Sequence, residues 1–176
     1  MLKEINGRKL IILIESSEIS KKVHDLGQQI TEDYKDKNLV IIGILKGSFI
    51  FLADLVRSIE IRTEIDFIRV SSYGKGINPG DIELITELQT PIKNRDVLLV
   101  EDLLDTGATL EFIKKYILSK QPASLKICAL MNKKKTRETA IDVDYVGFEI
   151  DDKFVIGYGT DFAEEGRNLP DIYVIE

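Results

Sequence analysis

The stretch VLLVEDLLDTGATL, residues 97–110, sets three carboxylates, two threonines and a glycine between apolar flanks. Its first four residues are all apolar, which is typical of a strand covered on both faces of a sheet. The sequence that follows carries Leu110, Ile113 and Ile117 at helical spacing. The stretch therefore predicts a buried strand that runs directly into an amphipathic helix.

The rest of the chain repeats this alternation of strand and helix. A first strand, from Lys9, ends at Ser16–Ser17, and either serine could cap a helix whose apolar positions begin at Ile19. A second helix is predicted after Gly47. Further strands are predicted at 39–45, 64–73, 96–104 and 125–132, and shorter ones at 145–150, 154–159 and 171–176. This alternation predicts an α/β fold with a mostly parallel twisted sheet flanked by helices.

Composition and charge are those of an ordinary globular protein. The 176 residues suit one domain with a single core, and 44% hydrophobic with 31% charged residues is not the composition of a disordered chain. The net charge of −6 indicates no general basic surface for nucleic acid. No apolar run is long enough to span a membrane, and no small-residue cleavage site marks a signal peptide.

Cys128 and His24 are expected to be structural. Cys128 is the only cysteine and lies in the apolar stretch LKICALM, which predicts a buried, inert thiol. Because no disulfide framework exists, we expect a reducing, cytoplasmic setting. His24 lies on a predicted helix, and nothing in its neighbourhood suggests a ligand.

Three polar segments follow predicted strands: LKGS at 45–48, SSYGKG at 71–76 and the opening stretch. In open α/β sheets, ligands bind in the crevice beyond the carboxyl ends of the strands. The three segments are therefore expected to contribute to one ligand site.

The letters Asp-Thr-Gly in the opening stretch also occur around the catalytic carboxylate of aspartic proteases. Such an enzyme needs two carboxylates that share a proton, so one motif per chain would require a symmetric dimer of an all-β protein. The predicted strand and helix on either side disfavour this reading. A second alternative is a merely structural turn with capping threonines. Against it stand Glu101 and Asp102, because burying two adjacent charges without partners is costly.

The remaining reading is a phosphate site. Backbone N–H groups from Asp105 to Thr109 would form an anion-binding nest at the start of a helix, and Gly107 would allow close approach. No Gly-Lys-Ser/Thr follows, so this is not a nucleotide P-loop. Glu101 and Asp102 would repel a phosphate unless they bind a sugar diol or a divalent cation. The predicted ligand is a ribose 5-phosphate that carries a second charged group.

Four stretches of the sequence resemble those of a known enzyme family. The opening stretch is similar to the loop that binds phosphoribosyl pyrophosphate in the type I phosphoribosyltransferases, in particular the hypoxanthine-guanine branch. Three further stretches fall in that family's order and spacing, so the likeness covers nearly the whole chain: LKGSFIFLADLVR at 45–57, DFIRVSSYG at 66–74 and VGFEIDDKFVIGYGTDFAEEGRNLP at 146–170.

The resemblance implies a fold and an activity. The fold would be a single phosphoribosyltransferase domain, residues 1–176, with a small hood of short strands from the first few residues and about 133–176. The activity would be transfer of phosphoribose to N9 of hypoxanthine or guanine, which gives IMP or GMP and pyrophosphate, with Mg²⁺. The family's habit implies a homodimer or homotetramer. Alternatives are a sister transferase that prefers xanthine, and a non-catalytic regulator that binds nucleotides or RNA.

The likeness also implies roles around the sugar. Glu101 and Asp102 would bind the ribose hydroxyls and the adjacent Mg²⁺. Asp105 would be the acid/base residue that manages the proton at purine N7. The 5′-phosphate would be bound by Asp105, Thr106, Gly107, Ala108 and Thr109.

Pyrophosphate would be bound at the other segments. Its site would consist of Lys46, Gly47, Ser72, Tyr73 and Arg167. The family carries a non-proline cis peptide here, which we expect at Leu45–Lys46. Ser72 and Tyr73 would begin the loop that closes over the reacting centre. This chain has Asn78-Pro79-Gly80 where relatives usually have Ser-Thr-Gly, and the proline is expected to stiffen that end of the loop.

The purine would meet residues of the last third of the chain. Lys133 would donate to the 6-oxo group, although the register of three consecutive lysines also allows Lys134. Phe154 would stack on the base, unless it is a core residue. Asp161 would lie near the 2-position and a second metal ion. The purine residues implied are Lys133, Lys153, Phe154, Val155 and Asp161, and the metal ligands are Glu101, Asp102 and Asp161.

Overall fold

The computed structural model describes residues 4–72, 82–133 and 141–175. In this part of the chain, a six-stranded sheet has the order β5-β4-β3-β6-β7-β8. All neighbouring strands are parallel except β5, which is antiparallel to β4. The strands are β3 (Leu39–Leu45), β4 (Thr63–Ser72), β5 (Ile82–Thr86), β6 (Asp96–Leu104), β7 (Ser124–Asn132) and β8 (Tyr145–Glu149).

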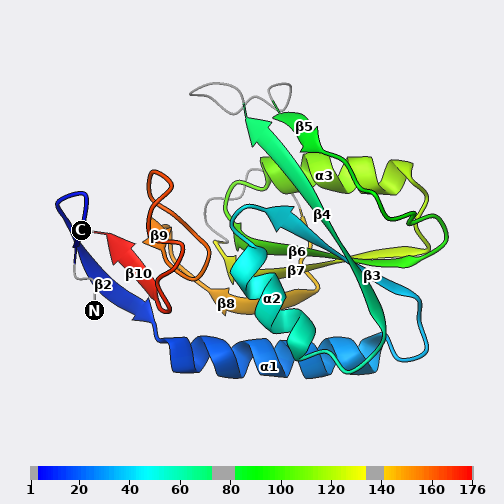
Figure 1. The fold of residues 1–176 in the computed structure, drawn as a ribbon, viewed down its shortest axis with the longest axis horizontal. Coiled ribbons are helices and arrows are strands. Elements are labelled where there is room, and N and C mark those ends of the chain that lie inside the picture. Colours follow the sequence, from blue (N-terminus) through cyan, green and yellow to red (C-terminus); the bar gives the residue numbers. More distant parts are fainter. Residues whose placement is uncertain (1–3, 73–81, 134–140, 176) are drawn as a thin grey trace.

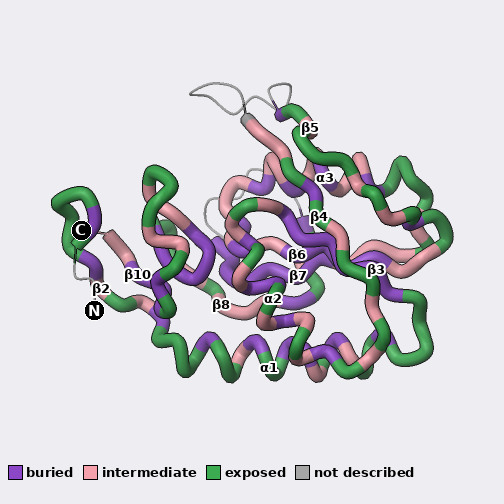
Figure 2. Tube along the Cα trace, viewed as in Figure 1, coloured by how far each residue is buried: buried purple, intermediate pink, exposed green. Residues whose placement is uncertain are grey.

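Helices cover both faces of this sheet, as the alternation in the sequence predicts (Figure 1). Helices α1 (Ser16–Asp33) and α2 (Phe49–Arg57) pack on one face, and α3 (Ala108–Ser119) packs on the other. Strand β3 shows why both layers are needed, because its first six residues are all buried. Figure 2 shows this buried central region between helical layers with exposed outer surfaces. None of the helices in the described ranges has the length and apolar character that crossing a membrane requires.

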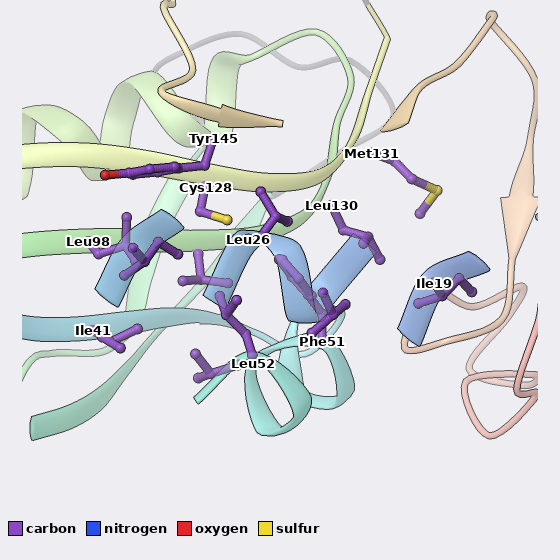
Figure 3. Close-up of a cluster of buried hydrophobic side chains, with 14 of the residues drawn as sticks. Ile19, Leu26, Ile41, Phe51, Leu52, Leu98, Cys128, Leu130, Met131 and Tyr145 are labelled. Carbon is purple, nitrogen blue, oxygen red and sulfur yellow. The ribbon is translucent and has the colours of Figure 1, made fainter. Parts of the chain in front are cut away.

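The core between the sheet and α1 and α2 is a cluster of interlocking apolar side chains (Figure 3). It includes Ile19 and Leu26 from α1, Phe51 from α2 and Leu98 from β6. Cys128 lies within it, fully buried, and this burial raises the pKa of its thiol. The expectation of a buried, inert cysteine is therefore confirmed.

A second, smaller sheet lies beside the first (Figure 1). Its strands are antiparallel and have the order β1-β2-β10-β9. Strand β8 falls within the range 133–176 but pairs with β7, so the small sheet takes only β9 and β10 from that range. The small sheet is made of β1 (Glu4–Ile5), β2 (Arg8–Ile14), β9 (Val155–Ile156) and β10 (Ile172–Ile175).

Two local predictions were wrong, and one strand was missed. Strand β5 was not predicted, because IELIT is short and lies at the sheet edge with exposed positions. The N-cap of α1 is Glu15 rather than a serine, and Glu15 forms a capping box with Glu18, so the helix already begins at Ser16. The strand predicted at 154–159 is limited to Val155–Ile156, because Gly157, Tyr158 and Gly159 have positive φ.

The strand order locates the site. Strand β3 lies between β4 and β6, and both pair with it in parallel. The chain leaves β3 toward β4 and later returns on the opposite side to form β6, so the order reverses between β3 and β6. In open α/β sheets this switch point, at the carboxyl ends of the strands, is where a crevice for ligands forms. The segment after β3 contains Lys46 and Gly47, and β6 ends in the opening stretch.

Candidate functional site

Glu101 and Asp102 occupy consecutive positions near the end of β6. Although side chains alternate across a strand, the two carboxylates lie close enough for each to affect the pKa of the other. Glu101 lines a pocket of about 210 Å³, together with Leu103, Leu104, Asp105, Thr106, Gly107, Thr109 and Leu110. Asp102 is buried on the other side against Gly47, where an added Cβ would overlap the carboxylate. A side chain at position 47 would therefore displace the Asp102 carboxylate.

The environment of these two carboxylates is electrostatically unfavourable for two negative charges. Burial raises the pKa of Glu101 well above its ordinary range, and the neighbouring charge of Asp102 raises it further. Burial also raises the pKa of Asp102, although a hydrogen bond from Glu101 and the charge of Arg167 oppose the rise. Glu101 Oε2 is buried without a hydrogen-bond partner among the described residues. A ligand hydroxyl, a cation or a water molecule could satisfy this atom.

The loop after β6 has the form of an anion-binding nest. Gly107 has φ 88°, a conformation that side chains disfavour, and it serves as the N-cap of α3. The first amides of a helix lack partners within the helix and attract negative charge. The hydroxyl of Thr106 accepts a long hydrogen bond of 3.5 Å from the Ala108 amide. Of the predicted phosphate residues, Asp105, Thr106, Gly107 and Thr109 line the 210 Å³ pocket.

The segment after β3 meets two other segments at Gly47. The Leu45–Lys46 peptide bond is cis, as expected. Gly47 touches Asp102 on one side, and its carbonyl faces Gly159 so closely that a Cβ on Gly159 would overlap it. The ends of β3 and β6 and the loop after β9 thus converge on one point.

The two cations predicted to bind pyrophosphate lie together, and acidic side chains pair with them. Lys46 Nζ is 2.8 Å from Glu164 Oε2, and Arg167 Nη2 is 3.4 Å from the same oxygen. Arg167 also lies 2.7 Å from Asp161 Oδ1 and donates to the Gly159 carbonyl at 2.8 Å. The charges of Lys46 and Arg167 hold the pKa of Glu164 below its ordinary value. Glu164 was not predicted from the sequence.

Lys133 lies next to the phosphate loop at the end of β7. Its side chain is only 6% exposed, and its ammonium group is 3.1 Å from Asp105 Oδ2 and 3.3 Å from Asp152 Oδ1. A buried ammonium needs such partners, because desolvation would otherwise favour its neutral form. The structure thus brings the predicted acid/base residue and the predicted purine donor into direct contact. Asp152, like Glu164, was missed.

The remaining predicted purine residues surround β9. Phe154 is 55% exposed, so the alternative of a core phenylalanine is wrong. The centroid of its ring lies 5.5 Å from that of Phe162, in an edge-to-face arrangement. Because more than half of the Phe154 side chain is exposed, it is available to stack on a ligand. Val155 is buried in β9, whereas Lys153 is exposed and borders a separate pocket of about 300 Å³.

Several predictions concern parts of the chain on which the structure is silent. Tyr73, Asn78-Pro79-Gly80 and Lys134 lie outside the described residues, and of Ser72 only its backbone at the end of β4 is described. His24, expected to be structural, is an exposed residue of α1.

Two of the three residues predicted to bind magnesium fit that role in the structure. Within the described ranges, no group of three or more histidine, cysteine, aspartate or glutamate side chains is arranged to hold a metal. Asp161, a predicted ligand, is paired with Arg167 instead. Magnesium, however, is commonly held by one or two carboxylates with water and substrate phosphates. Glu101, with its unpartnered buried oxygen, and Asp102 fit that mode.

Asp152 and Glu164 escaped prediction for a shared reason. Both lie in loops, where side chains follow no periodic pattern from which a role could be predicted. Both also pair with residues that are distant in the sequence. The available signal was the gathering of acidic residues beside Lys153 and Arg167.

Comparisons with known proteins agree with this geometry. The phosphoribosyl transferase domain model matches residues 13–163. The hypoxanthine-guanine phosphoribosyltransferase of Aquifex aeolicus is 45% identical over 177 residues, which is 99% of either chain. The hypoxanthine phosphoribosyltransferase of Escherichia coli is 42% identical over 90% of this chain and 91% of that protein. A crystal structure of the hypoxanthine phosphoribosyltransferase from Staphylococcus aureus has a TM-score of 0.91 and 42% identity, covering 94% of this chain and 91% of that one. This chain therefore belongs to the phosphoribosyltransferase family, in its hypoxanthine and hypoxanthine-guanine branch.

Proposed function

We propose that this protein is a purine-salvage enzyme that transfers the 5-phosphoribosyl group of phosphoribosyl pyrophosphate to N9 of hypoxanthine or guanine. The products would be IMP or GMP and pyrophosphate. The observation that supports this most is the contact of Lys133 with Asp105, at 3.1 Å, beside the phosphate loop. An ammonium donor next to a carboxylate is the complement of the O6 and N7 edge of a 6-oxopurine. An adenine would instead turn its 6-amino group toward a cation.

The sugar substrate would span the crevice between β3 and β6. Its 5′-phosphate would accept hydrogen bonds from the loop of Asp105 to Thr109, and Glu101 and Asp102 would bind the ribose hydroxyls. Its pyrophosphate would lie between Lys46 and Arg167, with Gly47 allowing close approach of the backbone. Ser72 and Tyr73 would cover the reacting centre.

In the reaction, purine N9 attacks the anomeric carbon while the bond to pyrophosphate breaks. Asp105 takes the N7 proton, which makes N9 a better nucleophile. Because the transition state resembles an oxocarbenium ion, most of the acceleration would come from positioning the two substrates and from stabilising the leaving group. Glu101 and Asp102 would hold Mg²⁺, which when bound offsets the charge of the departing pyrophosphate, and Asp161 would join them once it is released from Arg167.

The base would be held by residues at the end of β7 and around β9. Lys133 would donate to O6, and the exposed ring of Phe154 would stack on the purine. Backbone groups of Val155 and Lys153 would contact the far edge, with Asp161 near the 2-position. A non-catalytic regulator is disfavoured, because the acid/base and base-binding residues are all retained and the net charge of −6 offers no general attraction for RNA.

The direct test is an assay of radiolabelled bases with phosphoribosyl pyrophosphate and Mg²⁺. We expect nucleotide from hypoxanthine or guanine, no comparable product from adenine, and loss of activity with a chelator that removes Mg²⁺. Absence of nucleotide from both bases would contradict the enzyme assignment. Xanthine as the best substrate would favour the sister transferase, and adenine as the best substrate would contradict the role of Lys133.

The setting and assembly are also part of the proposal. A single buried cysteine suits a reducing cytoplasm. Ile65 and Phe67 are partly exposed on the same face of β4, at 45% and 36%, and they support an assembly of two or four copies. Sedimentation of the purified protein tests this, because a monomer at working concentration would contradict it.

A further inference from the structure

Glu164 places a carboxylate between the two cations assigned to pyrophosphate. Its Oε2 atom is 2.8 Å from Lys46 Nζ and 3.4 Å from Arg167 Nη2. One oxygen thus faces both positive groups, as an oxygen of a bound phosphate would. The two cations come from segments far apart in the sequence, and Glu164 is their common partner in the described part of the chain.

The backbone that presents Glu164 is unusual for its sequence. Phe162 and Glu165 form an antiparallel bridge, and the two residues between them, Ala163 and Glu164, have φ of 53° and 68°. Two positive φ values at the centre of a two-residue loop favour glycine, asparagine or aspartate. Alanine and glutamate are poor choices for such a turn. The turn sequence is therefore not explained by the turn itself, which points to a task for the side chain at 164.

Arg167 does not need Glu164 to keep its position. It donates to the Gly159 carbonyl at 2.8 Å and pairs with Asp161 at 2.7 Å. Its side chain is 20% exposed, whereas those of Lys46 and Glu164 are 44% and 66% exposed. An exposed ion pair of this kind contributes little to stability. Glu164 is thus weakly held and can be displaced by a stronger anion.

We propose that Glu164 is an internal competitor for the pyrophosphate site. This inference rests on the proposed binding of pyrophosphate by Lys46 and Arg167. In the ligand-free protein the carboxylate neutralises both cations. An incoming diphosphate carries more charge and displaces it, and the carboxylate repels the diphosphate while the two remain close. After the transfer reaction, return of Glu164 to Lys46 and Arg167 favours release of the pyrophosphate product.

The experiment compares Glu164→Gln with Glu165→Gln. Both changes remove one negative charge from neighbouring exposed positions, but the Glu165 carboxylate pairs with no cation in the described ranges. Binding of pyrophosphate is measured by calorimetry both with and without Mg²⁺. We expect Glu164→Gln to bind about twofold to fivefold more tightly than the parent protein, the range that an exposed ion pair allows. Glu165→Gln should bind within about 1.5-fold of the parent, because charge effects at exposed positions are screened.

A second variant separates binding from folding. Glu164→Gly removes the carboxylate and places at a positive φ the residue that tolerates it best. It should unfold at a temperature no lower than that of the parent and still bind pyrophosphate more tightly. In steady-state assays, both Glu164 variants should show stronger product inhibition by pyrophosphate, with the KM for hypoxanthine unchanged.

The possible results distinguish the competitor role of Glu164 from the proposed function of the enzyme. If the parent protein binds pyrophosphate and Glu164→Gln binds it equally or more weakly, the competitor role is overturned while the proposed function stands. Weaker binding by the variant only when Mg²⁺ is present would make Glu164 a partner of the metal, which also overturns the role. If the parent binds no pyrophosphate and forms no nucleotide, the proposed function fails, and this inference fails with it.

Discussion

The two proposed anion sites of this protein are built in opposite ways. The loop after β6 offers a phosphate the backbone amides at the start of α3, and its shape follows from a buried strand, from Gly107 and from the helix. The corner formed by Lys46, Asp161, Glu164 and Arg167 offers charged side chains from two separate segments, and those charges pair with one another. The backbone conformation of the fold determines the first site. Attraction and competition among charged side chains determine the second.

This difference determines how each site responds to substitution. Replacing a side chain in the loop after β6 should weaken phosphate binding only slightly, because the hydrogen-bond donors there are backbone N–H groups. Replacing a cation in the corner removes a principal binding group, because charge-assisted hydrogen bonds are about twice as strong as neutral ones. The following predictions test this contrast, beginning with the one residue of the loop whose side chain is expected to matter most.

Asp105→Asn should have the largest effect. The amide cannot take the N7 proton, so kcat should fall by about 10²- to 10⁴-fold, the usual range for general acid–base catalysis. Binding of IMP should change little, because the loop amides remain. Steady-state kinetics and calorimetry with IMP measure the two quantities. Unchanged turnover would remove Asp105 from proton transfer.

Lys133→Ala should have the next largest effect. It removes the donor to O6 and leaves Asp105 and Asp152 without their common cation. We expect the KM for hypoxanthine to rise about 10- to 100-fold, which corresponds to the loss of a charge-assisted hydrogen bond. The matched change Lys134→Ala should leave this KM within about twofold. The reverse outcome would mean that the neighbouring lysine is the donor.

Arg167→Ala and Thr109→Val compare the two anion sites directly. The first removes a cation from the corner, and the KM for phosphoribosyl pyrophosphate should rise about tenfold or more. The second removes only a hydroxyl from the loop, so the rise should be about threefold. Both variants should be measured at saturating hypoxanthine. Equal effects would contradict the distinction between a backbone site and a side-chain site.

Asp171→Asn should have the smallest effect, on stability rather than on activity. Asp171 joins the small sheet to the body, because it accepts hydrogen bonds from the Ser16 amide of α1 and the Tyr173 hydroxyl, both at 2.7 Å. Loss of this helix-end contact should lower the free energy of unfolding by about 1 kcal/mol at pH 7.

The pH dependence of this contribution has a definite sign. The bonds from Tyr173 and Ser16 lower the pKa of Asp171 below its ordinary value of 3.8. A carboxylate whose pKa is lowered on folding stabilises the protein fully above that ordinary value, and the contribution is lost as pH falls through the lowered one. The difference between the parent and Asp171→Asn in denaturant unfolding should therefore shrink below about pH 4. A difference that is constant from pH 7 to pH 2 would contradict this.

The contrast between the two sites also explains what the sequence could predict. Strands β3 and β6, helix α3 and the loop between them follow from apolar runs, helical spacing and Gly107, because these are local patterns. The cis bond at Leu45–Lys46 came from the resemblance and is confirmed. Strand β5 lacks a continuous apolar pattern, and its place depends on pairing with β4.

The ion pairs of the corner could not be predicted from local sequence patterns. Lys46 and Glu164 are 118 residues apart in the sequence, and their segments meet where Gly159 approaches Gly47. The pairing of Asp152 with Lys133 likewise depends on how the end of β7 meets the loop before β9. Local patterns specify backbone sites well. They do not specify which charged side chains meet across a crevice.

The most direct test is a crystal structure of the protein soaked with phosphoribosyl pyrophosphate and Mg²⁺. We expect the 5′-phosphate within hydrogen-bond distance of the backbone N–H groups of residues 106–109, with the ribose hydroxyls on Glu101 and Asp102. A ligand bound elsewhere, with this loop empty, would contradict it.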